Sequence, residues 1–193
     1  MKYGLIALLV GLAILVCGVC GGGCMLYSSY KTTISLDEDV KAKWADVEVD
    51  LQRRYELIPN IVETVKGYAK HEKGIIETVA ESRTKYFNAN GAAAKQEASA
   101  GLERALSRLL VLQEKYPDLK ANQQFQNLAV SLEGTENRIA EKRRRYNESV
   151  RKLNSHIRGP IGSIAASWAD VKRADFFEVD EAAKEAPKVD FDS

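Results

Sequence analysis

The sequence has few of the residues on which catalytic and metal sites depend. Its 193 residues include only two histidines, His71 and His156, and no cysteine after residue 24. Position 75, one helical turn after His71, is Ile where the zinc-protease motif HExxH has its second histidine. The E-x-x-H pair of di-metal bundles is missing, and no Ser/His/Asp set or phosphate-binding loop can be assembled by spacing. We therefore expect no catalytic, cofactor-binding or metal-binding residues, and a protein that is not an enzyme.

The sequence also lacks an excess of charge of one sign and the alternation typical of strands. Lysine and arginine number 28 against 27 acidic residues, so the whole chain has no basic excess that would favour a nucleic-acid partner. Few windows show period-two patterning, whereas alanine, leucine, glutamate, lysine and arginine dominate. These features predict an all-α protein that does not bind nucleic acid.

One long uncharged stretch lies near the start of the chain. Residues 4–26 contain no charged side chain, and 23 residues would give about 34 Å of helix, enough to cross a bilayer. A cleaved signal peptide is the alternative, although the apolar run exceeds the usual ~7–15 residues. We predict a single-pass membrane anchor over residues 1–30 in the inner membrane of a bacterium. Lys2 favours a cytoplasmic N-terminus, which would leave the following domain outside the cytoplasm.

Small residues fall on one face of this predicted anchor. Such a face lets two helices approach closely, which predicts homo-oligomers, although glycine is also common in membrane helices without this role. The residues concerned are Gly4, Ala7, Gly11, Gly18 and Gly22. Cys17, Cys20 and Cys24 share another face, but a metal site would need a fourth ligand. We favour a role as small structural residues, with thiol acylation, or a lipoprotein-type modification of Cys24, as alternatives.

Apolar stripes at helical spacing mark the rest of the chain as a helical bundle, and their predicted core positions include Val47, Leu51, Leu102, Leu109, Phe125 and Ile139. We expect helices over residues 35–57, from Pro59 to about Phe87, from Ala93 to Tyr116 and from Asn122 to Arg158. Pro117 is expected to end the third of these helices, and residues 159–162, which include Pro160, are expected to end the fourth. Ser35 and Asn122 are the expected N-caps, and the first stripe continues across Pro59, which favours a kink in one long helix. The polar residues 70–72 are expected to form a turn at the end of that stripe.

Short turns between these segments predict an antiparallel four-helix bundle with long, kinked helices over residues 31–178. The aromatic residues of the segment after Gly162, which are Trp168, Phe176 and Phe177, are expected to dock on the bundle. Residues 179–193 are mostly acidic and are expected to form a disordered tail.

Two sets of charged residues are candidate sites. Arginines beside the apolar seam need carboxylates on a facing helix, so one set is predicted to fix bundle register through ion pairs: Arg53, Arg54, Glu133 and Glu136. Basic residues cluster on the fourth helix, and the set predicted to contact an anionic surface is Arg143, Arg144, Arg145, Arg151 and Lys152. A solvated helix face that complements acidic neighbours is the ordinary interpretation of this second set.

Two segments of the sequence closely resemble the signature segments of the LemA family. They are WADVEVDLQRRYELIPNIVETVKGYAKHE, residues 44–72, and LEGTENRIAEKRRRYNESVRKLNSHIR, residues 132–158. The resemblance covers most of residues 25–178. It implies a bacterial membrane protein with an N-terminal anchor and an antiparallel four-helix domain, a family for which no enzymatic activity is established.

These observations favour a non-enzymatic, membrane-anchored helical scaffold or adaptor of the bacterial cell envelope. It would self-associate through its anchor and bundle, or dock another envelope protein. The alternative is a membrane-remodelling or anionic-lipid-sensing module that uses the basic face of the fourth helix.

Overall fold

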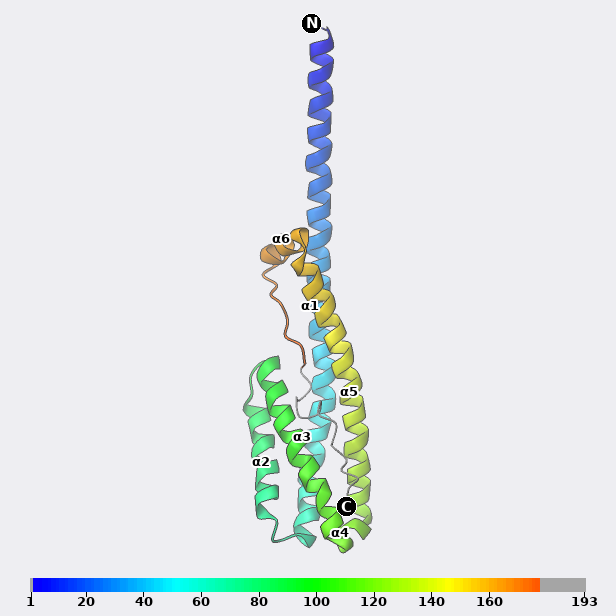
Figure 1. Ribbon diagram of the computed structural model, residues 1–193, viewed down its shortest axis with the longest axis vertical. Helices are drawn as coiled ribbons and strands as arrows, with labels where there is room; N and C mark the ends of the chain where they lie inside the picture. The colour runs from blue at the N-terminus through cyan, green and yellow to red at the C-terminus, as the bar shows by residue number, and fades with distance from the viewer. Residues whose placement is uncertain (1, 178–193) are drawn as a thin grey trace, which may run out of the picture. The chain divides into compact units, whose positions relative to one another are not determined.

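The computed structural model describes residues 2–177, and the side chains of residues 2–10, 13, 14 and 19 lie outside this description. All regular structure in the described residues is helical, as the sequence predicts (Figure 1). The helices are α1 (Lys2–Tyr68), α2 (Lys73–Asn88), α3 (Ala92–Lys115), α4 (Pro117–Ala121), α5 (Gln123–Arg158) and α6 (Pro160–Ala169).

Helix α1 corrects two of the predicted boundaries. It runs from Lys2 through Pro59 to Tyr68, so the predicted N-cap at Ser35 is wrong and the predicted continuity across the proline is right. The helix that was expected from Pro59 to Phe87 is wrong as a single element, because residues 69–72 separate α1 from α2. This break coincides with the turn that residues 70–72 were expected to form.

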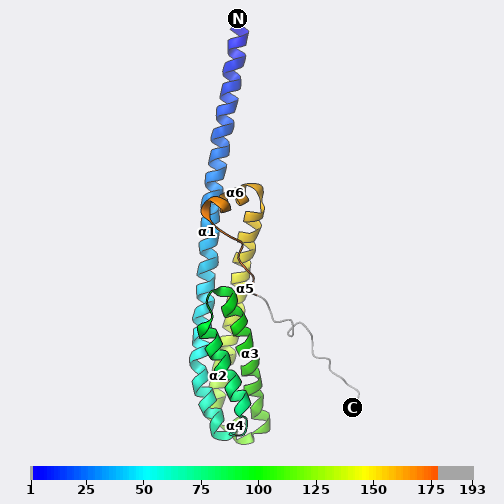
Figure 2. The same ribbon diagram turned by 90° about the vertical axis from the view of Figure 1, so that its left-hand side faces the viewer.

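The chain forms two compact units, which are described separately. One comprises residues 44–146 and 175–193. Of the second range, the structure describes residues 175–177. In this bundle unit, parts of α1 and α5 lie side by side with α2 and α3, and successive long helices run in opposite directions (Figures 1 and 2). Short connections produce this arrangement, since only residues 69–72 join α1 to α2 and residues 89–91 join α2 to α3.

The core of the bundle unit follows the predicted stripes. Val47, Leu51, Ile61 and Val65 of α1 have no exposed surface, and Leu102 and Leu109 of α3 are equally buried. On α5, Phe125 and Ile139 are fully buried. The spacings between these positions within each helix are sums of three- and four-residue steps, so one face of each helix enters the core.

Local chemistry explains the starts of α3, α4 and α5 in this unit. The backbone N–H of Phe125 donates to the Asn122 side-chain oxygen at 2.8 Å, which confirms Asn122 as a cap of α5. Gly91 precedes α3 with a φ of 83°, a conformation that favours glycine. Helix α4 was not predicted, because Pro117 was interpreted as the end of a helix, whereas it occupies the first turn of a new one.

The second unit comprises residues 1–43 and 147–174. The His156 ring Nε2 lies 3.0 Å from the Thr33 hydroxyl, and the Ser149 hydroxyl donates to Asp39 at 2.6 Å, so polar contacts join α1 to α5. Helix α6 was not predicted, because Pro160 was again interpreted as a stop. An added Cβ at Gly162 would lie 2.0 Å from the His156 carbonyl oxygen, so the turn into α6 needs glycine there.

No helix within the described residues carries a stretch that is both long and apolar enough to cross a membrane. The anchor predicted over residues 4–26 stays a prediction.

Candidate functional site

A buried arginine network lies at the centre of the bundle unit. The side chain of Arg54 on α1 is only 1% exposed, and its guanidinium forms an ion pair with Glu136 on α5. The same guanidinium donates to the backbone oxygen and to the hydroxyl of Ser99 on α3, each at 3.3 Å. This cation on α1 thus contacts two other helices, α3 and α5, and a buried arginine needs such partners because it stays charged at any ordinary pH.

A second arginine shares the Ser99 hydroxyl. Arg143 on α5 donates to this hydroxyl at 3.4 Å and to the Glu103 carboxylate of α3 at 3.3 Å. Its guanidinium carbon also lies 4.3 Å from the centre of the Phe177 ring, a cation–π contact. We use the name "arginine network" for Arg54, Ser99, Glu103, Glu136 and Arg143.

The predicted register residues fall into two classes. Arg54 and Glu136 are brought together, whereas Arg53 and Glu133 are exposed and have no ion pair among the described residues. Ser99 and Glu103 were missed, because a serine and a glutamate on a helix give no signal of burial. Arg138 supplies another link from α5 to α1, since its Nε lies 3.2 Å from Asp50. These contacts support the register hypothesis, which stays a prediction.

An aromatic cluster joins α1 to α2. Tyr55 of α1 is fully buried and stacks on Tyr86 of α2 with 3.9 Å between ring centres, and Phe87 lies 5.6 Å from Tyr55. Burial raises the pKa of both tyrosines, that of Tyr86 to about 12. The phenols therefore stay neutral at physiological pH and serve as core residues.

A groove with a volume of about 880 Å³ opens beside these aromatic rings. Its lining combines exposed apolar side chains with amides and charges from three helices: Glu48, Val49, Gln52, Arg53, Glu56, Leu57, Asn60, Tyr86, Phe87 and Lys95. Lys95 pairs with Glu48, and the Gln52 amide donates to Glu56 at 3.3 Å. Val49 is 69% exposed and Phe87 is 48% exposed, so the groove offers apolar contact surface together with polar groups at its edge.

The predicted anionic-surface contacts on α5 have acidic neighbours. Arg143 belongs to the arginine network and is only 18% exposed. Arg144 and Arg145 both contact Glu141, and their hydrogen bonds lower the pKa of that carboxyl to about 2. In the other unit Lys152 pairs with Glu148 at 3.1 Å, whereas Arg151 is exposed. This pairing agrees with the interpretation as a solvated helix face, and contact with lipid stays a prediction.

The predicted self-association face is partly described. Gly4 and Ala7 lie outside the described side chains. Gly11, Gly18 and Gly22 are exposed, and an added Cβ at each would meet nothing within 4 Å. Cys17, Cys20 and Cys24 are free and exposed. Among the described residues no three His, Cys, Asp or Glu side chains lie close enough to hold a metal ion.

The aromatic residues just before residue 178 were expected to dock on the bundle, and Phe177 does so. It is 4% exposed, and its ring centre lies 6.1 Å from that of Trp44. The backbone oxygen of Asp175 accepts a hydrogen bond from the Tyr146 hydroxyl at 3.0 Å. Phe176 is 42% exposed and Trp168 is 65% exposed, so of the three predicted aromatic residues only Phe177 is buried.

Comparison with known proteins identifies relatives over most of the chain. The model of the LemA family matches residues 43–191. Two magnetosome proteins MamQ of Paramagnetospirillum magneticum are each 27% identical to the chain, over 79% of its length. The magnetosome protein MamQ of Magnetospirillum gryphiswaldense is 26% identical over 79% of the chain. The matched region spans 66% of the length of the first two relatives and 65% of the third. Because the family model matches well over half of the sequence, including both segments that suggested the resemblance, the chain belongs to the LemA family.

Proposed function

We propose that this chain is a membrane-anchored, non-enzymatic helical scaffold of the bacterial cell envelope that associates with copies of itself. Residues 4–26 would span the membrane, and the bundle unit would be its contact module. Membership of the LemA family and the similarity to bacterial magnetosome proteins support a role in a membrane-linked assembly.

The observation that carries the proposal is the continuity of α1. One unbroken helix contains both the uncharged residues 4–26 and the core positions from Val47 to Val65. An uncharged helical segment of about 34 Å matches a hydrocarbon layer of about 30 Å. The same helix carries Arg54 of the arginine network, so the predicted anchor continues directly into the core of the bundle.

Fractionation of cells tests the anchor. The full chain should stay with membranes after washing with high salt and carbonate and should be released by detergent. A chain that begins at residue 31 is the matched control, because it keeps all of the predicted bundle. Release of the full chain by high salt alone would contradict the proposal.

Energy transfer between two differently labelled copies in membranes tests self-association. The double variant Gly11→Leu/Gly18→Leu places bulk on the predicted contact face and should lower the transfer to the level of a non-associating membrane protein. Gly23→Leu is the matched control, because Gly23 lies on a different face of the helix and an added Cβ there also meets nothing within 4 Å. Equal transfer for both variants would exclude this face as the contact.

A further inference from the structure

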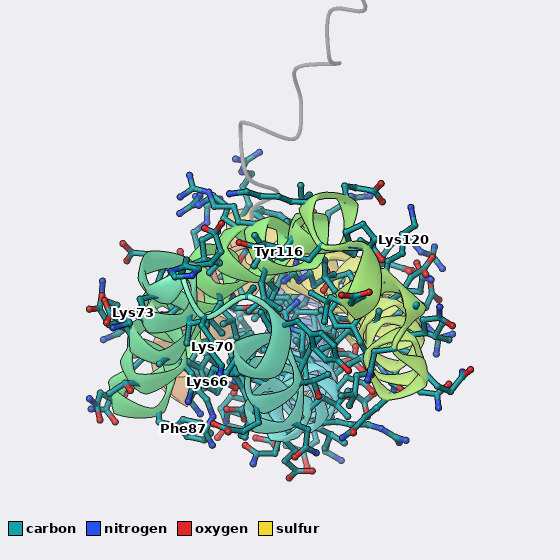
Figure 3. All side chains as sticks on the ribbon, turned by 90° about the horizontal axis from the view of Figure 1, so that it is seen from below. Lys66, Lys70, Lys73, Phe87, Tyr116 and Lys120 are labelled. Carbon is teal, nitrogen blue, oxygen red and sulfur yellow. The ribbon has the colours of Figure 1, made fainter. Side chains whose placement is uncertain are left out.

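A second groove lies between the end of α1 and the start of α2, in the bundle unit. Its volume is about 550 Å³, and its lining residues are Val62, Lys66, Lys70, Lys73, Ile76, Glu77 and Ala80. Val62 and Ile76 are 8% and 9% exposed and form an apolar floor. Figure 3 shows Lys66, Lys70 and Lys73 on the same side of the bundle end, away from Lys120. We use the name "lysine groove" for this site.

The rim of the lysine groove carries three lysines and one carboxylate, that of Glu77, so its net charge is positive. Lys66 lies 2.7 Å from Glu63, a neighbour on its own helix. Lys70 and Lys73 are exposed and have no ion pair with the residues that the structure describes. An apolar floor beneath unpaired lysines suits a segment that carries an aromatic side chain between carboxylates.

The chain itself contains such a segment. Residues 178–193 include six acidic residues, which are Glu178, Asp180, Glu181, Glu185, Asp190 and Asp192, and two lysines, which gives a net charge of 2 − 6 = −4. The single aromatic residue in this stretch, Phe191, lies directly between Asp190 and Asp192.

The starting point of this segment is fixed within the bundle unit. Phe177 is buried against Trp44, and the Asp175 carbonyl accepts the hydrogen bond of Tyr146. Lys66 follows Trp44 by 22 residues on α1, a distance of about 33 Å along the helix. Phe191 follows Phe177 by 14 residues, which span up to about 46–50 Å when extended. The chain is therefore long enough to reach the lysine groove, with slack of about 15 Å for a path around the helix.

We propose that residues 178–193 dock in the lysine groove of their own chain. Phe191 lies over Val62 and Ile76, and the carboxylates of Asp190 and Asp192 face Lys70 and Lys73.

Photo-crosslinking of the full chain in detergent tests this contact. Phe191 is replaced by a photoreactive phenylalanine analogue, and the linked peptides are identified by mass spectrometry. The expected product is a monomer in which position 191 is linked to residues 62–80, with a yield that does not change on dilution. A link to other residues, or a link to residues 62–80 found only in dimers, would overturn docking within one chain.

Charge exchange gives an independent readout. The variant Lys70→Glu/Lys73→Glu should lower the cross-link yield roughly tenfold, because two attractive pairs become repulsive. Adding Asp190→Lys/Asp192→Lys to this variant should restore it. Lys120→Glu is the matched control, since Lys120 is an exposed lysine at the same end of the bundle and lies away from the groove (Figure 3). Equal losses for both lysine variants, or no rescue, would refute the proposed pairing.

Discussion

The substitution Glu136→Gln isolates the electrostatic role of the arginine network. It keeps the size of the side chain and removes the charge that faces Arg54. The Arg54 side chain is 1% exposed, whereas that of Glu136 is 36% exposed, so the two partners are not equivalent. Loss of the carboxylate leaves a buried guanidinium that cannot lose its proton and has only neutral acceptors, which are the oxygens of Ser99 and the amide oxygen of the new glutamine.

The expected loss of stability follows from this asymmetry. Removing one partner of a buried ion pair typically costs about 3–5 kcal/mol, because the other charge stays buried without compensation. In a protein of this size about 1 kcal/mol corresponds to a change in melting temperature of about 2–4 °C. Glu136→Gln should therefore lower the melting temperature by about 6–20 °C.

Thermal unfolding of the full chain in detergent, followed by circular dichroism at 222 nm, measures this change. Glu133→Gln is the matched control, since Glu133 is exposed on the same helix and its substitution should change stability by less than about 0.5 kcal/mol. The double variant Arg54→Met/Glu136→Gln should recover part of the loss, because it removes the buried charge itself. The reasoning is refuted if Glu136→Gln and Glu133→Gln have the same melting temperature.

Three further predictions concern glycine, aromatic packing and pH. Gly162→Ala should destabilise the protein by about 1–3 kcal/mol in thermal unfolding, because the added Cβ would collide with the backbone of His156. Gly101→Ala should stabilise the protein by about 0.5–1 kcal/mol, because the added Cβ within α3 would meet nothing within 4 Å. Phe177→Ala should cost about 3–5 kcal/mol and change the fluorescence of Trp44, which its ring contacts; unchanged emission would contradict this packing. Burial raises the pKa of Tyr86 to about 12. The neutral phenol therefore contributes its full stabilisation of the folded state below pH 10, and this contribution is lost as the pH rises towards 12. Absorbance at 295 nm should show an ionisation near pH 12 that the substitution Tyr86→Phe removes. If this ionisation persisted in the variant, it would belong to another group and the assignment to Tyr86 would be wrong.

The sequence alone determined the helical class and the inward faces of the helices, because both depend on periodicity within a single segment. Leu51, Leu109 and Ile139 were placed in the core by spacing alone, and each is fully buried. Asn122 was recognisable as a cap because its bond to the backbone spans only three residues.

Tertiary packing decided what local patterns leave open. Arg53 and Arg54 are adjacent and chemically identical, yet only Arg54 turns towards Glu136 and Ser99. The prolines also show that a residue type alone does not predict the local structure, since Pro59 lies inside a helix while Pro117 and Pro160 each begin one. The pairing of Arg54 depends on which helices stand opposite it, and contacts between residues 45 or 82 positions apart are not encoded in any local pattern.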